Sequence, residues 1–366
     1  MPILARAPGK IYIAGEYAVI EPGYPAIIAA VDQFVTVKVE KRESGGRIQS
    51  ANAQTFPLNW TRKGDQLIID DRDNPFQFIL SAVERTEQYI KAIGKPLAYY
   101  QLTVGSDLDR KDGKKYGLGS SAAVTVATVN ALLAYYGIQA DRQTVFKLAA
   151  LAHLSVQGNG SCGDIAASVY GGWIAYSSFD RQWLSQAIHS GREWLDLITR
   201  NWPGLSVHPL TLPPSLRLFV GWTGIPASTY RLVDKVEQAR HGQKEAYQQF
   251  LARSKSCVNQ MITGFQMEQA AVIQSGIRQY RQILRQLSEL CGLSIETEKL
   301  QQLCDIAERY GGSAKSSGAG GGDCGIVLAD RAASTEQIRK EWDKQGILPL
   351  GIHVYDGKRE QRGGKL

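Results

Sequence analysis

The sequence predicts an α+β protein built from two domains. Segments with the periodicity of strands alternate irregularly with segments that have the periodicity of helices. The segment 200–216 contains four prolines, a composition typical of a boundary between domains. We therefore expect one domain over residues 1–205 and a second over residues 206–366, each of ordinary domain size.

Two strands and one long helix are predicted in the first 110 residues. Alternation of apolar and polar residues over 34–40 indicates a strand with one buried face, and residues 99–104 form a second. An apolar stripe indicates a helix over 74–93. Asn74 is a suitable N-cap for this helix, and Pro75 suits the first helical position.

The remaining elements follow in the same way. A helix rich in small residues is expected over 120–136, and a second helix runs from its cap at Asp141 to about residue 156. Beyond the prolines, residues 217–223 indicate a strand, and helical patterns dominate over 230–310. The apolar run 324–328 is the last predicted strand.

Composition favours small polyanionic substrates over other partners. Of the 366 residues, 43% are hydrophobic and 21% are charged, as in ordinary soluble proteins, and the net charge is +7. A positive chain suits nucleic acid or phosphorylated small molecules. Because Lys and Arg are scattered and form no long basic run, we expect small-molecule substrates and no nucleic-acid partner.

The sequence also indicates where the protein works. No stretch of about 18 apolar residues occurs, so we expect no membrane-spanning helix and no membrane partner. Residues 1–10 lack the apolar core and cleavage site of a secretory signal. The five cysteines form no CxxC pair and are odd in number, which argues against disulfides or a zinc site. The expected location is the cytoplasm, and the sequence predicts no particular oligomeric state.

Loop 1, residues 116–121 (Tyr-Gly-Leu-Gly-Ser-Ser), is the strongest chemical signal. Its glycines let the backbone approach an anion, and it opens a helix whose first N–H groups lack internal partners. The hydroxyls of Ser120 and Ser121 can reach phosphate oxygens or a magnesium ion. Lys114 and Lys115 can neutralise phosphate charge. The alternative interpretation is a capped helix whose glycines only make a turn.

Two further glycine-rich segments have the same character. Loop 2, residues 157–164 (Gln-Gly-Asn-Gly-Ser-Cys-Gly-Asp), ends in Asp164, which can cap a helix or act beside a reacting phosphoryl group. The segment 311–322 carries many small residues and runs directly into the strand 324–328. Such a segment loses conformational entropy on folding, which favours close approach of a ligand over a simple linker. Lys10 lies in a strand-like apolar stretch, as a surface lysine or as a phosphate ligand.

These elements, in this order, resemble the GHMP kinases. The matching motifs are residues 8–19 (with Pro-Gly-Lys and Gly-Glu-Tyr-Ala-Val), 117–123 (Gly-Leu-Gly-Ser-Ser-Ala-Ala) and 315–325 (Lys-Ser-Ser-Gly-Ala-Gly-Gly-Gly-Asp-Cys-Gly). The resemblance implies an N-terminal domain similar to the second domain of ribosomal protein S5 and a ferredoxin-like C-terminal domain. ATP would lie between them on loop 1.

Within the family, the chain is similar to the members that phosphorylate (R)-5-phosphomevalonate. The similarity rests on Tyr17, on residues 158–164, and on residues 220–223 with 227–229. It implies ATP-dependent formation of (R)-5-diphosphomevalonate in the mevalonate pathway to isopentenyl diphosphate. One alternative is a mevalonate kinase or another family member that acts on an alcohol. Another is a non-catalytic nucleotide- or RNA-binding relative, although Lys10 and Asp164 are both present.

The resemblance also implies roles for single residues. Lys10 and Asp164 would be catalytic, with Asp164 holding Lys10, and Ser121 would bind Mg²⁺. His153 stands where mevalonate kinases carry an acidic magnesium ligand, and its apolar surroundings favour a core histidine. The residues expected to bind ATP are Lys114, Lys115, Gly117, Leu118, Gly119, Ser120, Ser121 and Ala122. Those expected to bind the acceptor are Tyr17, Ser161, Ser228, Ser317, Gly318 and Ala319.

Overall fold

The computed structural model describes most of the chain. It covers residues 2–357 apart from 52–55, 70–74, 109–114, 191–192, 227–231, 233–235, 237–239 and 241. The predicted site residues Lys114 and Ser228, and the predicted cap Asn74, lie outside the described residues.

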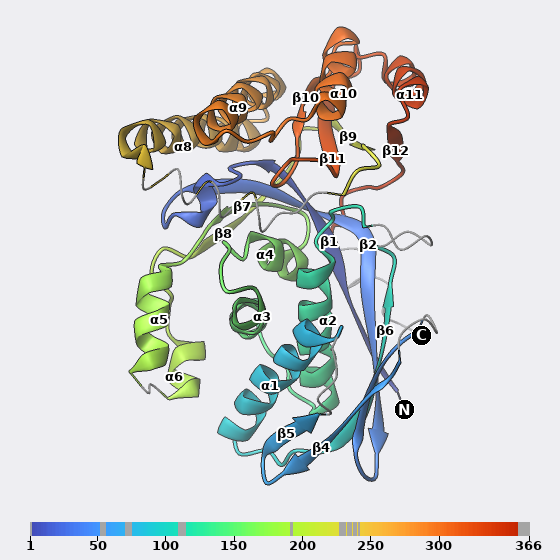
Figure 1. The fold of residues 1–366 in the computed structure, drawn as a ribbon, viewed down its shortest axis with the longest axis vertical. Helices are drawn as coiled ribbons and strands as arrows, with labels where there is room; N and C mark the ends of the chain where they lie inside the picture. The colour runs from blue at the N-terminus through green and yellow to red at the C-terminus, as the bar shows by residue number, and fades with distance from the viewer. Residues whose placement is uncertain are drawn as a thin grey trace.

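The first half of the chain is organised around an eight-stranded sheet (Figure 1). Its order is β5-β4-β3-β6-β2-β7-β8, and β1 pairs with β2 off this path. Every pairing is antiparallel except β3 with β6. The strands are β1 (Ile3–Ala14), β2 (Pro25–Arg42), β3 (Gly46–Ser50), β4 (Leu58–Lys63), β5 (Gln66–Ile69), β6 (Tyr99–Ser106), β7 (Trp173–Ser177) and β8 (Ser206–Leu210).

Helices cover one face of this sheet (Figure 1). They are α1 (Gln77–Ala92), α2 (Ser120–Tyr135), α3 (Arg142–Gln157) and α4 (Gly163–Tyr170), with the shorter α5 (Arg181–His189) and α6 (Trp194–Thr199) further out and the 3-10 turn η1 (Ala18–Ile20) after β1. Helix α2 contacts β1, β2 and three other helices. Its small side chains allow this central position because they let neighbouring backbones approach on every side. Helix α2 is therefore held against β1 and β2.

The second half has the strand order of a ferredoxin-like domain. Its antiparallel sheet runs β10-β11-β9-β12, formed by β9 (Arg217–Trp222), β10 (Ser313–Ser316), β11 (Cys324–Ala329) and β12 (Leu348–Leu350). Its helices are α8 (Lys244–Gln266), α9 (Ala270–Cys291), α10 (Glu298–Arg309) and α11 (Thr335–Lys344). Among the described residues, three helices lie between β9 and β10 and one lies between β11 and β12, which matches the split βαβ pattern with added helices.

The two halves share one hydrophobic core. A single buried cluster contains Ile11 and Val37 of the first sheet together with Val220 and Ile326 of the second. Helices α8 and α9 contact β2 and β1 respectively. The end of the chain returns to the first sheet, where Val354 bridges to Val31.

The structure departs from the expected elements at three places. Helix α1 begins at Gln77, and Pro75 lies in the turn before it instead of at the first helical position. Residues 313–316 of the third glycine-rich segment are a buried strand, β10, because β11 supplies a partner that the sequence pattern does not reveal. The remaining loop is residues 317–323. Strand β8 belongs to the first sheet, and this sheet therefore continues past residue 205. The predicted domain boundary at residue 205 stays a prediction.

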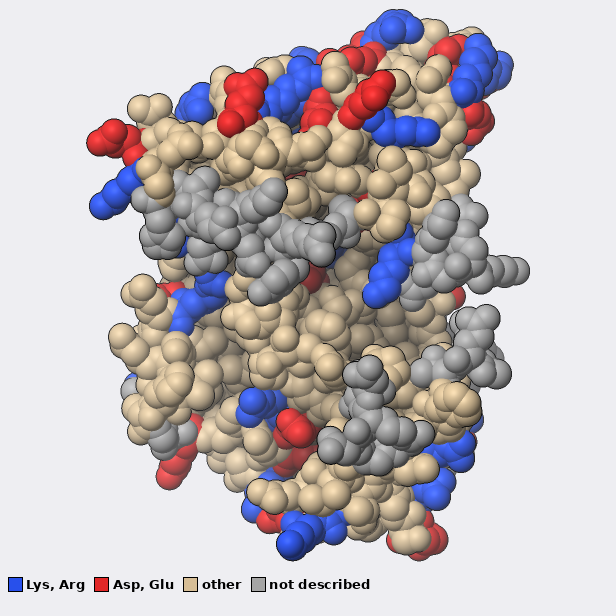
Figure 2. All heavy atoms as spheres, viewed as in Figure 1, with Lys and Arg blue, Asp and Glu red and all other residues tan. Residues whose placement is uncertain are grey.

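Charge is mixed over the described surface. Figure 2 shows Lys and Arg interspersed with Asp and Glu on the face in view, instead of gathered into one basic patch. Within the part of the chain that the structure describes, none of the helices has the length and apolar character needed to cross a bilayer.

Candidate functional site

The glycine-rich loops meet at one cavity of about 690 Å³ between the two halves of the molecule. Loop 1, loop 2 and the 317–323 loop all contribute to its wall, as does strand β1. The predicted site residues on this wall are Lys10, Tyr17, Lys115, Gly117, Leu118, Gly119, Ser120, Ser121, Ser161, Asp164, Ser317, Gly318 and Ala319. Ala122 does not line the cavity, because its methyl group is fully buried in the core.

Loop 1 brings the start of α2 to the cavity. Gly117 and Gly119 have φ angles of 78° and 83°, a conformation that favours glycine, and α2 begins at the next residue, Ser120. The first helical hydrogen bond runs from the Ala123 N–H to the Gly119 carbonyl, so the N–H groups before Ala123 belong to the open first turn. With the partial positive charge of the helix terminus, this turn can bind a phosphate.

Lys10 is fastened to loop 1 from strand β1. Its backbone N–H donates to the Leu118 carbonyl at 2.8 Å, and its Nζ donates to the Gly117 carbonyl at 3.1 Å. A Cβ atom on Gly119 would lie only 3.0 Å from the Lys10 side chain, so the glycine leaves room for the lysine. The ammonium group is therefore placed beside the phosphate-binding turn.

The expectation that Asp164 holds Lys10 stays a prediction. Among the described residues, no ion pair joins the two side chains, and the Lys10 ammonium group donates to the Gly117 carbonyl of loop 1. Nor is Asp164 the N-cap of α4, since Cys162 takes that position with a φ of 57°. Asp164 lies in the first turn of α4, half-buried, with its carboxylate on the cavity wall. Its charge adds to the effect of burial in raising the pKa of Tyr12.

Tyr12 is a cavity residue that sequence reasoning missed. Its hydroxyl lies 3.2 Å from the Ser161 hydroxyl of loop 2, and its carbonyl accepts a hydrogen bond from the Ser317 hydroxyl at 2.8 Å. Tyr12 therefore joins loop 2 to the 317–323 loop. The available signal was the period of two along β1, because Lys10 and Tyr12 project from the same side of a strand.

Ser121 and His153 form the part of the site that suits a cation. The Ser121 hydroxyl lies 3.3 Å from Nε2 of His153, whose ring is buried and stacked on Phe78. Burial lowers the pKa of His153, which keeps the imidazole neutral at pH 7. A neutral imidazole can accept a hydrogen bond from the Ser121 hydroxyl. The lone pairs of the serine oxygen then stay free to coordinate a cation. His153 is thus a core histidine, as expected, but one that reaches the site.

The described residues fit Mg²⁺ only with help from a substrate. In the part of the chain with described structure, no group of three or more His, Cys, Asp and Glu side chains could hold a metal ion. Magnesium is commonly held by one or two protein oxygens together with substrate phosphates and water. Ser121 and Asp164 both line the cavity, and each carries an oxygen of the kind that magnesium takes as a ligand.

Tyr17 connects the first motif to the 317–323 loop. It is buried, with an unusual φ of 64° for a residue other than glycine, and its hydroxyl donates to the Ala319 carbonyl. Burial raises the pKa of Tyr17, so the phenol stays protonated and keeps this hydrogen bond at neutral pH. The sequence motif predicted Tyr17 at the site. In the structure its hydrogen bond to Ala319 joins the first half of the molecule to the second.

A buried ion pair that the sequence did not reveal lies next to Tyr17. Lys315 of β10, with no exposed surface, pairs with Glu16, whose side chain is 2% exposed. The Tyr280 hydroxyl donates to the Glu16 carbonyl at 3.0 Å, which adds α9 to the same junction. This pair joins the first motif to the strand that leads into the 317–323 loop. The two residues are 299 positions apart, which is why no local pattern indicates the contact.

The chain matches two protein-family models. They are the GHMP kinases N terminal domain over residues 77–172 and the GHMP kinases C terminal over residues 270–348. The chain is also similar to a phosphomevalonate kinase from Streptomyces sp. (strain CL190), with 39% identity over 363 residues and 96% of each chain covered.

Solved structures show the same similarity. Streptococcus pneumoniae phosphomevalonate kinase in complex with phosphomevalonate and AMPPNP is 31% identical, with a TM-score of 0.84 over 96% of this chain and 99% of that chain. The Lin0012 protein from Listeria innocua is 37% identical, with a TM-score of 0.92 over 97% of this chain and 98% of that chain.

Proposed function

This chain belongs to the GHMP kinases, and we propose that it transfers the γ-phosphoryl group of ATP to (R)-5-phosphomevalonate. The products are ADP and (R)-5-diphosphomevalonate, an intermediate of the mevalonate pathway to isopentenyl diphosphate. The observation that carries the proposal is the meeting of the three family motifs at one cavity, together with 39% identity to a phosphomevalonate kinase over nearly the whole chain.

The acceptor supplies its own nucleophile. The second pKa of a phosphate monoester is about 6, so its terminal oxygens are mostly ionised at pH 7. One of these oxygens attacks the γ-phosphorus, the bond from the γ-phosphorus to the β,γ-bridging oxygen breaks, and ADP leaves. No proton has to be removed, so the main barrier is repulsion between two polyanions.

The residues around the cavity suit that task. Lys10, held beside loop 1, would neutralise charge on the transferred group, and the first turn of α2 would bind the ATP phosphates. Ser121 and Asp164 would hold a bound Mg²⁺, which would supply further positive charge beside the ATP phosphates. Asp164 would orient the reactants and not act as an essential base.

The acceptor would lie against loop 2 and the 317–323 loop. Ser161 and Ser317 offer hydroxyls there, and both are linked through Tyr12. Lys115, exposed at the cavity rim, can reach an anionic substrate. The residues of loop 2 and the 317–323 loop would therefore determine which acceptor substrate binds.

The proposed location is the cytoplasm. All five cysteines are free thiols, as is usual in a reducing compartment, and ATP is available there.

A substrate comparison tests the proposal. ADP release would be followed by a coupled assay with phosphomevalonate, mevalonate and homoserine at equal concentrations. We expect turnover with phosphomevalonate at least about a hundredfold above the two alcohols, since discrimination of 10⁴ or more is possible where buried polar groups are left unpaired by the wrong substrate. Faster turnover of either alcohol would replace this proposal with another member of the family.

A further inference from the structure

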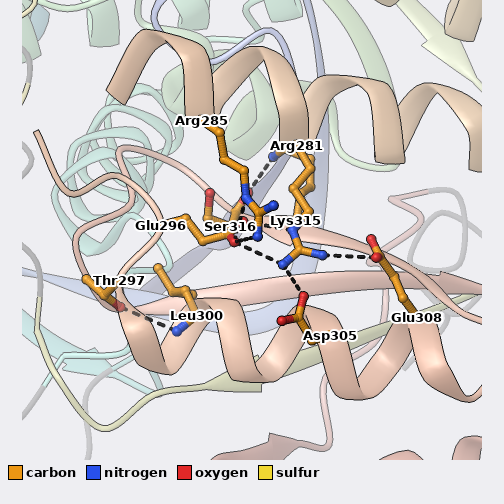
Figure 3. A network of polar contacts seen from close by, with 9 residues as sticks. All are labelled: Arg281, Arg285, Glu296, Thr297, Leu300, Asp305, Glu308, Lys315 and Ser316. Carbon is orange, nitrogen blue, oxygen red and sulfur yellow. Dashed lines mark hydrogen bonds and ion pairs between the residues drawn. The ribbon is translucent and has the colours of Figure 1, made fainter. Parts of the chain in front are cut away.

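A buried arginine of α9 lies at the centre of an ion-pair network in the second half of the molecule (Figure 3). We refer to Arg281, Arg285, Glu296, Asp305 and Glu308 as the Arg281 cluster. Arg281 is 3% exposed and contacts all three carboxylates, Glu296 at 2.8 Å, Asp305 at 2.5 Å and Glu308 at 3.0 Å. Arg285 adds a second contact to Glu296 at 2.5 Å.

Glu296 is the residue that both arginines share. Its side chain is 6% exposed, and its two carboxylate oxygens accept two hydrogen bonds from Arg281 and two from Arg285. Such bidentate pairs fix geometry as well as charge. Buried ion pairs often contribute little net stability, so positional control is a better physical reason for the Arg281 cluster than stability alone.

The neighbour of Glu296 holds the 317–323 loop. The Ile295 carbonyl accepts a hydrogen bond from the Gly321 N–H at 2.8 Å. Gly320 comes so close that a Cβ atom there would lie 2.3 Å from the same oxygen. A shift of residues 295–296 should therefore also move the 317–323 loop, because Gly320 and Gly321 are packed directly against the Ile295 carbonyl.

The same loop lines the cavity, on the side where the proposed function places the acceptor. The Ala319 carbonyl accepts the Tyr17 hydrogen bond, and the Ser317 hydroxyl donates to Tyr12. The Arg281 cluster itself does not line the cavity. A route of direct contacts thus runs from Arg281 through Glu296, Ile295 and Gly321 to the cavity wall.

We infer that Glu296 is a positioning residue that sets the place of the 317–323 loop and thereby the affinity for the acceptor. The part of this inference that concerns the acceptor rests on the proposed function. The part that concerns the loop does not, and it can be measured without any substrate.

The first test is hydrogen–deuterium exchange of the Glu296→Gln variant. The isosteric amide keeps the shape of the side chain but removes the charge shared by two arginines. We expect the amide of Gly321 to exchange about tenfold faster than in the wild type, which corresponds to about 1.4 kcal/mol of lost protection.

A matched control separates positioning from general destabilisation. Glu87 of α1 is also 6% exposed and is bound by both terminal nitrogens of Arg62, but this pair lies in the first half of the chain and away from the cavity. Glu87→Gln should cost similar stability and leave Gly321 exchange unchanged. Equal acceleration of Gly321 exchange in both variants would overturn the inference.

Kinetics supply the second test. With Glu296→Gln we expect KM for phosphomevalonate to rise about tenfold, with KM for ATP and kcat within about twofold. Gly320→Ala should also raise KM for phosphomevalonate. In the double variant Glu296→Gln/Gly320→Ala the increase in KM should be smaller than the product of the two single increases, because both substitutions displace the same contact with Ile295. An increase in KM for ATP as large as that for phosphomevalonate, or fully multiplicative effects, would overturn the inference.

If Glu296→Gln does not fold, Arg285→Gln is the alternative variant. It should disturb the position of Glu296 less, because Arg285 is 34% exposed and Arg281 still holds Glu296. The same changes in smaller size are expected, and their absence counts against the inference. If the wild type does not use phosphomevalonate, the proposed function fails, while Gly321 exchange still decides whether Glu296 positions the loop.

Discussion

The role proposed for Lys10 depends on where its ammonium group lies. Its ammonium group is held 3.1 Å from the Gly117 carbonyl, beside the first turn of α2 and on the wall of the cavity. A positive charge fixed there before the reaction needs no reorganisation when charge moves between two polyanions. The contribution of Lys10 should therefore appear in the rate of transfer more than in binding of either substrate.

We expect Lys10→Ala to lower kcat by about 10²–10³, or about 3–4 kcal/mol of transition-state stabilisation. Steady-state kinetics at saturating ATP and phosphomevalonate would measure it. Lys340→Ala is the control, since this lysine is 58% exposed on α11 and pairs with the exposed Glu336. A Lys10→Ala enzyme within tenfold of wild-type turnover would exclude the proposed role.

Asp164 gives a second prediction for a single residue. If it orients the reactants and the acceptor is already ionised, Asp164→Asn should lower kcat by about 10–10², below the effect of losing an essential base. The pH–rate profile should keep its shape, because no proton transfer has been removed. Activity of the variant that recovers only as pH rises would instead identify Asp164 as the base.

Helix α3 illustrates how a local signal determines an element. Asp141 caps it as predicted, with its carboxylate accepting the Thr144 N–H at 2.7 Å. Helix α3 packs against α1, α2 and α4 and carries His153 and loop 2 at its C-terminal end. The cap therefore helps to position one side of the cavity from the opposite end of the helix.

We expect Asp141→Ala to lower the free energy of unfolding by about 1 kcal/mol at pH 7. The hydrogen bond from Thr144 lowers the pKa of Asp141 below 3.8, so its stabilisation is present above that pH and is lost as pH falls through the lowered value. The difference between wild type and variant in urea unfolding should shrink over that range. Asp141→Asn, which retains a capping oxygen, is the control, and a loss of stability as large as that of the alanine variant would contradict the interpretation.

At the scale of the whole molecule, contacts between the halves build the site. The cavity takes its wall from β1, the starts of α2 and α4, and the loop between β10 and β11. Tyr17 with Ala319 and Glu16 with Lys315 each join the first motif to the last. The two halves should therefore unfold together instead of as independent domains.

Lys315→Met tests this coupling. Removal of one partner leaves the Glu16 carboxylate buried without its charge partner, so we expect a loss of about 3–5 kcal/mol in the free energy of unfolding. Urea unfolding followed by tryptophan fluorescence would measure it. Lys340→Met, which breaks an exposed pair, should cost no more than about 1 kcal/mol. Two separate transitions in wild type, or equal losses in both variants, would contradict the coupling.

The local sequence determined much of this protein. Glycines in loop 1, the cap at Asp141 and the small residues of α2 act within a few positions of themselves, so their structural consequences could be predicted. The order of three motifs indicated the family and the ATP-dependent reaction. The ion pair of Glu16 with Lys315, the place of Tyr12 between two loops and the identity of β10 as a strand depended on the tertiary structure. The physical reason is that each requires a partner brought from far along the chain, and no periodicity or spacing encodes such a partner.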